Sequence, residues 1–260
     1  MNLKKCPIEF IKFAHLLSDK SESLILKYFR TKLKIKSKAD NSPVTIADTE
    51  SELLIRKLIT TNYPNHGIIS EEHSDLNPNA EFVWVIDPID GTRSFIAGHK
   101  DFGTLIALLY KNIPILGIIN CPAHKERWQG VINKKTYLNG KVTSTSKINN
   151  LNKCYSFSSG LYFEDPNFKK LYDKLIKKVK YYRFGGDCYM YGMLASGFID
   201  IVVEDTLKIH DYMALIPIIE GAGGKVSDRY GKKITINSKG SFVGSCSQNI
   251  HKQVIKILNS

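Results

Sequence analysis

The stretch from Asp87 to Arg93 combines residue types that could bind a ligand and act on it. Asp87 and Asp90 lie three residues apart, directly after the apolar run from Phe82 to Ile86. This run predicts a buried strand, and Pro88 predicts its end, because proline has a fixed φ and no backbone N–H. Gly91 lets the backbone approach a ligand, and the amides after it could open a helix towards an anion. An Asp-Pro turn with an aspartate cap is the simpler alternative, but it explains one aspartate better than two.

A third acidic position follows a second short apolar run. Glu71 comes directly after residues 67–70, which predict another strand. If the two strands are neighbours, Glu71, Asp87 and Asp90 meet at one sheet edge, where their charges repel one another unless a cation is present. Carboxylate oxygens suit Mg²⁺ or Mn²⁺ rather than zinc, which prefers Cys and His. An ordinary acidic turn at Glu71 and Glu72 is the alternative.

Several motifs, in order along the chain, resemble those of one family. Residues 87–92, Asp-Pro-Ile-Asp-Gly-Thr, are similar to the signature of the inositol monophosphatase family, the lithium-sensitive, magnesium-dependent phosphomonoesterases. Residues 41–48 resemble its upstream motif, and residues 69–72 resemble its Gly-Glu-Glu motif with Ser70 in place of glycine. Residues 185–187 and 210–211 follow in the family's order, so the resemblance covers nearly the whole chain.

The resemblance implies a site with two or three metal ions, Mg²⁺ with Mn²⁺ as a substitute. Metal 1 would take Glu71, Asp87 and the carbonyl of Ile89, and metal 2 would take Asp87, Asp90 and Asp211. A third, weaker ion would lie near Glu71. For Asp211 the alternative is a cap at the start of a helix.

The resemblance also implies catalysis by a metal-activated water, without a covalent phosphoenzyme. Thr92, held by Asp48, would orient the water and help to deprotonate it, with Glu71 as the third catalytic residue. The amides of Gly91, Thr92 and Arg93 would hold the phosphate. Asp48 also fits a capping box that begins at Thr45. Lys38 resembles a basic residue of the family's site, but it lies in a lysine run and a solvated lysine is the simpler interpretation.

Substrate contacts follow from the same resemblance. Gly186, Asp187 and Glu204 would face the leaving group, although Asp187 is also a natural N-cap and Glu204 could be a surface carboxylate. Residues 185–189 are similar to the histidinol-phosphatase branch, whereas His210 departs from the aromatic residue usual before Asp211. We therefore expect a phosphomonoesterase for a small polyol or amino-alcohol phosphate, inositol monophosphate first and histidinol phosphate as the alternative.

Composition limits the other classes of function. The formal net charge of +12 raises the alternative of an RNA- or transcription-complex-binding protein, but the lysines lack interleaved aromatics and indicate a solvated surface. Five scattered cysteines without a Cys-x-x-Cys argue against a disulfide framework and suit a reducing cytoplasm. No signal peptide or membrane span is visible, and the family resemblance implies a homodimer.

The periodicity predicts elements that could position these residues. Before about residue 145 the pattern predicts two helices followed by closely spaced, mostly antiparallel strands. After it, predicted helices and strands alternate. We expect an α/β fold with an α+β N-terminal half, with lobes at residues 1–145 and 146–260, and the resemblance implies a layered α-β-α-β-α sandwich. The expected helices are 7–29 (with a break near Ser18 as an alternative), 46–61, 166–179, 187–196, 211–222 and 247–258. The expected strands are 67–70, 82–87, 103–110, 114–120, 127–132, a hairpin at Asn139-Gly140, 154–158, 181–184, 199–204, 225–228 and 242–245.

Overall fold

The computed structural model describes residues 6–37, 43–160 and 163–260. Its helices are α1 (Ile8–Tyr28), α2 (Ile46–Asn62), α3 (Thr92–Ile96), α4 (Pro166–Ile176), α5 (Asp187–Ala195), α6 (Ile209–Tyr212), α7 (Leu215–Gly221) and α8 (Gln248–Ile257), with a 3₁₀ turn at Leu151–Lys153. Its strands are β1 (Lys36–Ser37), β2 (Pro43–Val44), β3 (Gly67–Ser70), β4 (Phe82–Asp90), β5 (Gly103–Tyr110), β6 (Ile113–Cys121), β7 (Glu126–Val131), β8 (Tyr137–Leu138), β9 (Lys141–Val142), β10 (Tyr155–Ser158), β11 (Tyr181–Phe184), β12 (Ile201–Glu204), β13 (Lys225–Ser227) and β14 (Phe242–Ser245).

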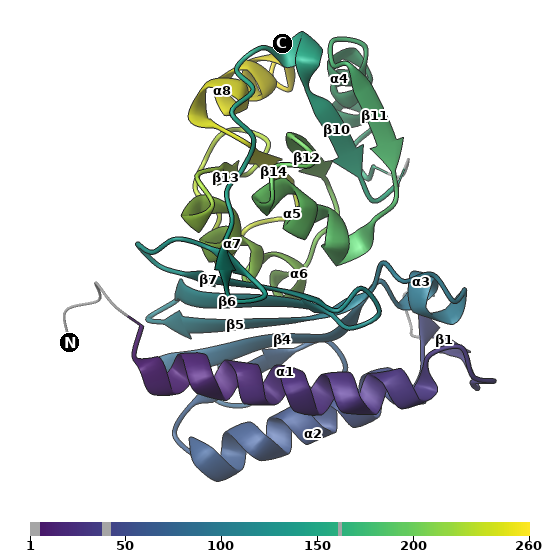
Figure 1. Ribbon diagram of the computed structural model, residues 1–260, viewed down its shortest axis with the longest axis vertical. Helices are drawn as coiled ribbons and strands as arrows, with labels where there is room; N and C mark the ends of the chain where they lie inside the picture. Colours follow the sequence, from purple (N-terminus) through teal and green to yellow (C-terminus); the bar gives the residue numbers. More distant parts are fainter. Residues whose placement is uncertain (1–5, 38–42, 161–162) are drawn as a thin grey trace.

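These elements stack in five layers (Figure 1). The outer helices α1 and α2 cover one face of a seven-stranded sheet, and α5, α6 and α7 lie between that sheet and a five-stranded one. The helices α4 and α8 cover the far face of the second sheet. This is the α-β-α-β-α sandwich that the family resemblance implied, so the fold class is confirmed. The division into lobes at residue 145 stays a prediction.

The first sheet has the order β3-β4-β5-β6-β7-β8-β9. Its strands are antiparallel except for β3 and β4, which run parallel. The expectation of a mostly antiparallel sheet is therefore confirmed, and the pairing of β3 with β4 is the exception. Because β3 and β4 are parallel, their carboxyl ends lie at the same edge of the sheet.

The second sheet has the order β11-β10-β12-β14-β13. The strands β11, β10 and β12 are parallel to one another. The strand β14 pairs antiparallel with β12, and β13 in turn pairs antiparallel with β14. A mixed sheet of this kind agrees with the expected alternation of helices and strands after residue 145.

The central strand β4 is buried on both faces because alternate side chains enter different cores. Trp84 and Ile86 pack with residues of α1 and α2. Val83 and Val85 belong instead to the large cluster that includes α5, α7 and the second sheet. Successive side chains of a strand point to opposite faces of its sheet. Because both faces of this sheet are covered, the residues from Phe82 to Ile86 must all be apolar.

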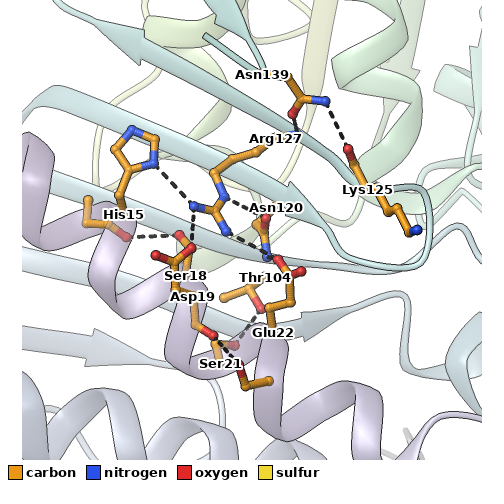
Figure 2. A network of polar contacts seen from close by, with 12 residues as sticks. His15, Ser18, Asp19, Ser21, Glu22, Thr104, Asn120, Lys125, Arg127 and Asn139 are labelled. Carbon is orange, nitrogen blue, oxygen red and sulfur yellow. Dashed lines mark hydrogen bonds and ion pairs between the residues drawn. The ribbon is translucent and has the colours of Figure 1, made fainter.

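A polar network around Arg127 of β7 ties α1 to the sheet (Figure 2). Its guanidinium contacts Asp19 at 2.7 Å and Glu22 at 3.2 Å, both on α1. Its Nε donates to the Asn120 side chain of β6 at 2.7 Å. These contacts hold α1 over the strands together with its apolar packing, for example that of Phe13 on Trp84.

Several element boundaries differ from the expected ones for identifiable reasons. The helix α1 is unbroken at Ser18, because the Ser18 hydroxyl is buried and donates to the Ala14 carbonyl at 2.9 Å within the helix. The single helix expected over 211–222 is two helices, α6 and α7. Pro217 explains the interruption, because it has no N–H to continue the hydrogen bonding from α6. Three expected ends were wrong by two or three residues: α4 ends at Ile176, β12 starts at Ile201 and β4 runs on to Asp90.

Within the described ranges no helix is both long and apolar enough to pass through a bilayer. All five cysteines lie within these ranges, and each is a buried free thiol.

The helix α7 lies directly on the first sheet because two strand residues there have no side chain. A Cβ added at Gly117 of β6 would lie 2.0 Å from the Ala214 carbonyl oxygen. At Gly130 of β7 it would lie 2.4 Å from the backbone of Pro217 and Ile218. This close approach sets the height of α6 and α7 above the sheet.

We predict that Gly117→Ala destabilises the fold by about 2–3 kcal/mol, because backbone must move to admit one methyl group. Gly244→Ala is the matched control, since its nearest obstacle is the flexible end of Leu194 at 3.0 Å. Urea unfolding should show a clearly lower midpoint for Gly117→Ala than for Gly244→Ala. Equal midpoints would contradict the role given to this contact.

Candidate active site

An irregularity in β4 sets the positions of its two aspartates. Asp87 pairs with Leu105 of β5, and Asp90 pairs with Gly103, so three steps on β4 match two steps on its partner. One extra residue of this kind is a β-bulge. In a regular strand, residues three apart face opposite sides of the sheet, so the bulge is what lets both carboxylates lie on one side. The strand therefore does not end at Pro88, as predicted, but accommodates the proline at the bulge.

A chain of buried hydroxyls supports the bulge from behind. The Thr104 hydroxyl of β5 donates to the Pro88 carbonyl at 2.9 Å. Ser21 of α1 lies 2.8 Å from the Thr104 hydroxyl and 2.9 Å from the hydroxyl of Ser51 on α2. All three hydroxyls are fully buried. The helical layer is thus connected by hydrogen bonds to the point where β4 deviates.

The end of β3 is held by another buried group. Glu52 of α2 accepts from the Ser70 hydroxyl at 2.6 Å and from the backbone N–H of Glu72 at 2.7 Å. Glu71 lies between these two anchored residues. Ser70, which stands where the family usually has glycine, thereby gains a defined partner in this chain.

The structure brings the acidic residues together in two groups that share one member. Glu71, Asp87 and His210 each place one possible ligand atom within 4.8 Å of the others, and so do Asp87, Asp90 and Asp211. Asp211 comes from α6, where its carboxylate also accepts from the Lys208 N–H at 2.7 Å. The expected helix cap at Asp211 and its place among the carboxylates are therefore both present.

This gathering is electrostatically unfavourable without a cation. Burial raises the pKa of Asp87 well above its ordinary value, and the charges of Glu71 and Asp90 raise it further. Burial followed by the Asp211 charge likewise raises the pKa of Asp90. Asp87 Oδ1 and Asp90 Oδ2 are buried and have no hydrogen-bond partner among the described residues. Buried carboxylate oxygens without partners fit a bound metal ion, which supplies the missing ligand and charge.

Thr92 and Asp48 are in direct contact, as the sequence analysis predicted. The Thr92 hydroxyl lies 3.1 Å from Asp48 Oδ1 and 3.1 Å from the Ile89 carbonyl. The other oxygen of Asp48 accepts from the Thr45 hydroxyl at 2.6 Å and from the Thr45 N–H at 2.8 Å. The capping box and the contact with Thr92 therefore coexist.

A pocket of about 300 Å³ opens over these residues. Gly91, at φ 83°, starts α3 there, and Asp187 lines the pocket next to it, since a Cβ added at Gly91 would lie 2.9 Å from the Asp187 side chain. A larger hollow, of about 620 Å³, lies beside the Arg127 network, and none of its lining residues belongs to the two acidic groups. Because Glu71, Asp90 and Asp211 line the smaller pocket, we place the candidate site there. The lining of that pocket is Pro43, Glu71, Asp90, Gly91, Thr92, Arg93, Ser159, Asp187, Met190, Tyr191, Leu207 and Asp211.

Asp187 enters the pocket at the first turn of α5. Its carboxylate accepts from the Ser94 hydroxyl at 2.5 Å. Gly186, and not Asp187, is the N-cap of α5, in a left-handed conformation. The expected aspartate cap was therefore wrong, and the Asp187 side chain contacts α3 instead of its own helix.

Glu204 does not line the pocket, in contrast to the substrate contact that the sequence analysis expected. Only 4% of the residue is exposed, and its oxygens accept from the Ser159 N–H at 2.5 Å and the Ser159 hydroxyl at 2.6 Å. Ser159 is the residue that reaches the pocket, and Glu204 holds it from behind. Burial raises the pKa of Glu204 to about 7.

Three residues near the site were missed by the sequence analysis. Ser159 directly follows β10, and a polar residue at the carboxyl end of a parallel strand could have been recognised as a signal. Ser94 carried no signal, because its role depends on Asp187 from a distant helix. His210 was noted only as a departure from the family pattern, although it lies beside Glu71 and Asp87. Lys38 and the start of the upstream motif at Asn41 and Ser42 lie outside the described residues.

We predict that Glu204 makes stability depend on pH in a defined direction. A carboxyl whose pKa rises from 4.5 to about 7 on folding contributes stability in full below pH 4.5 and loses it as the pH rises through 7. Over that window wild type should lose about 3 kcal/mol of unfolding free energy that Glu204→Gln does not lose.

Urea unfolding of the metal-free protein at pH 5 and pH 8 measures this difference. Glu220→Gln, at an exposed position, is the control and should follow wild type. If Glu204→Gln also follows wild type, Glu204 does not titrate in this window.

Comparison with known proteins agrees with this geometry. The family model described as Inositol monophosphatase family matches residues 7–260. Bifunctional phosphatase IMPL2, chloroplastic, from Arabidopsis thaliana is 43% identical over 258 residues, which cover 96% of this chain and 75% of that protein. A histidinol-phosphatase from Chlorobaculum parvum is 36% identical over 232 residues, 88% of this chain and 90% of that protein. The solved structure of an inositol monophosphatase from Zymomonas mobilis has a TM-score of 0.89 and 38% identity, and the match covers 97% of this chain and 98% of that one. The chain therefore belongs to the inositol monophosphatase family and is a metal-dependent phosphoric monoester hydrolase.

Proposed function

We propose that this chain hydrolyses an amino-alcohol phosphate of the histidinol phosphate type, with inositol monophosphate as a second substrate and Mg²⁺ as its metal. The observation that carries the proposal is the pair of acidic groups sharing Asp87, beside a pocket that a further carboxylate, Asp187, also lines. The similarity to a bifunctional phosphatase and to a histidinol-phosphatase supports the order of the two substrates.

The two acidic groups correspond to two metal positions. Glu71, Asp87 and the Ile89 carbonyl would hold one ion, and Asp87, Asp90 and Asp211 would hold the other, with a weaker third position near Glu71. Hard oxygen ligands favour Mg²⁺ or Mn²⁺. Bound there, two divalent cations would neutralise the phosphate monoester and lower the pKa of a bound water. Millimolar lithium should inhibit, because it can enter a magnesium site without supplying the same charge.

Thr92 would act on the attacking water. Its hydroxyl is fixed by Asp48, whose second oxygen is already occupied by Thr45. An oriented hydroxyl in contact with a buried carboxylate can accept a proton from water and pass its own to Asp48. Asp48 is suited to receive it, because burial raises its pKa.

The start of α3 would receive the phosphate. Gly91, Thr92 and Arg93 line the pocket, and the left-handed conformation of Gly91 turns the chain so that the following amides can face an anion. The Arg93 side chain adds a positive charge on the same side. These groups cannot distinguish one monoester from another.

Selectivity must come from groups that face the leaving group. Asp187 and Ser159 are the polar residues that α5 and the segment after β10 contribute to the pocket lining. A carboxylate accepts hydrogen bonds from a polyol, but it binds an ammonium group more strongly, because hydrogen bonds between charged partners are the stronger kind. The homodimer implied by the resemblance, and any association with nucleic acid, stay predictions.

Thr92→Ala should lower kcat by about 100-fold or more, because it removes the group that orients the water. Thr92→Ser, which keeps the hydroxyl, should retain most of the activity. Phosphate release at saturating Mg²⁺ gives kcat, and calorimetry gives the Mg²⁺ affinity. If Thr92→Ala changes only the metal affinity, Thr92 acts as a structural cap.

Asp187→Asn should reduce kcat/KM for histidinol phosphate about tenfold more than for inositol monophosphate, a difference of about 1.4 kcal/mol. Asp173→Asn, on the exposed side of α4, is the control for the same change in net charge. Both substrates are assayed at one pH and salt concentration, with and without EDTA. Equal losses on the two substrates would show that Asp187 does not distinguish the leaving groups.

A further inference from the structure

His210 lies in the acidic cluster, where the carboxylates alone were expected. It precedes Asp211 in α6 and is only 8% exposed. One of its ring nitrogens, an oxygen of Glu71 and an oxygen of Asp87 all lie within 4.8 Å of one another. Its Nε2 atom lies 3.5 Å from Asp211 Oδ1, which is longer than a normal hydrogen bond, so this neighbour does not hold the ring tightly.

These separations suit a common metal ion. Bonds from a first-row metal to nitrogen or oxygen are about 2.0–2.2 Å long, so two ligand atoms on one ion are at most about 4.4 Å apart. Small side-chain movements would bring the three atoms of this group into that range. The neighbouring group of Asp87, Asp90 and Asp211 contains oxygen ligands only.

A second observation points to a ligand at the same place. Asp87 is 1% exposed, and its Oδ1 atom has no hydrogen-bond partner among the described residues. A carboxylate oxygen buried in this way requires a cation or a donor. Asp87 belongs to both groups, so its second oxygen can serve a different ion from its first.

We propose that His210 is a metal ligand, completing with Glu71 and Asp87 a mixed nitrogen and oxygen site that prefers Mn²⁺ or Zn²⁺ to Mg²⁺. The proposal rests on the proposed function, which gives Glu71 and Asp87 to this metal position. Imidazole binds transition metals well, whereas Mg²⁺ prefers oxygen ligands and gains little from a nitrogen. The all-oxygen group beside it keeps its preference for Mg²⁺, so the two positions differ in metal selectivity.

Pulsed electron paramagnetic resonance tests the bond directly in the wild-type protein. Metal-free protein is loaded with one equivalent of Mn²⁺, and the electron spin echo is examined for modulation by a coordinated ¹⁴N nucleus. We expect imidazole nitrogen modulation in wild type and its loss in His210→Phe, which keeps a ring of similar size but cannot ligate. Absence of the modulation from wild type that has bound Mn²⁺ would overturn the proposal.

Affinities provide a second and independent readout. His210→Phe should bind Mn²⁺ and Zn²⁺ at least about tenfold more weakly, while its Mg²⁺ affinity changes less than about threefold. His66→Gln, where the histidine lies among the aromatic residues near α1, is the matched control and should behave as wild type. An equal loss for all three ions would indicate that His210 only supports the carboxylates, and would overturn its role as a ligand.

The same measurements separate this proposal from the proposed function. If wild type binds neither Mn²⁺ nor Mg²⁺, or if Asp87→Asn binds them as tightly as wild type, the metal positions themselves are wrong. If both ions bind and depend on Asp87 while His210→Phe is unchanged, the metal positions stand and only the part played by His210 is wrong.

Discussion

The repulsion among buried carboxylates is the constraint on which the rest of this structure depends. Asp87, Asp90 and Asp211 approach one another closely, with Glu71 next to them, and two of the aspartate oxygens are buried with no hydrogen-bond partner in the part of the chain that the structure describes. Such an arrangement opposes folding unless cations occupy it, since removing unpaired charges from water is expensive. The fold therefore holds these side chains in place at a cost to stability. Buried hydrogen bonds next to Glu71 and next to the β4 bulge fix the backbone that carries them.

Those supporting contacts come from layers that are far apart in the chain. The bulge in β4 puts Asp87 and Asp90 on one side, and hydroxyls from α1, α2 and β5 hold the bulge through the Pro88 carbonyl. Glu52 of α2 fixes the residues on both sides of Glu71. On the opposite side, the close approach of α7 to Gly117 sets where α6, and with it Asp211 and His210, meets the sheet. Glu71, Asp87 and Asp90 are thus held by contacts between the outer helices and the first sheet, whereas Asp211 and His210 depend on the packing of α6 and α7 on the other face of that sheet.

The pocket separates two tasks. In the proposed function, β4 and the start of α3 would receive the phosphate of any monoester. The groups proposed to face the leaving group come from α5 and from the end of β10, where Asp187 and Ser159 are held by Ser94 and Glu204. The two parts are joined at Asp187, because Ser94 belongs to α3 and a Cβ added at Gly91 would lie 2.9 Å from the Asp187 side chain.

The sequence by itself determined the apolar strand before Asp87, the order of the motifs and therefore the family, because those features depend on local residue types and spacing. It also predicted most elements, and it placed Thr92 beside Asp48 through the resemblance. It could not determine that β4 continues through Pro88, because a bulge depends on pairing with β5. Nor could it show that α1 passes unbroken through Ser18, since that requires the hydroxyl to be buried within the helix. Only the tertiary structure placed Glu204 behind Ser159 and His210 beside Glu71. Burial and contacts between distant layers decide such positions, and neither is recorded in the spacing of residues along the chain.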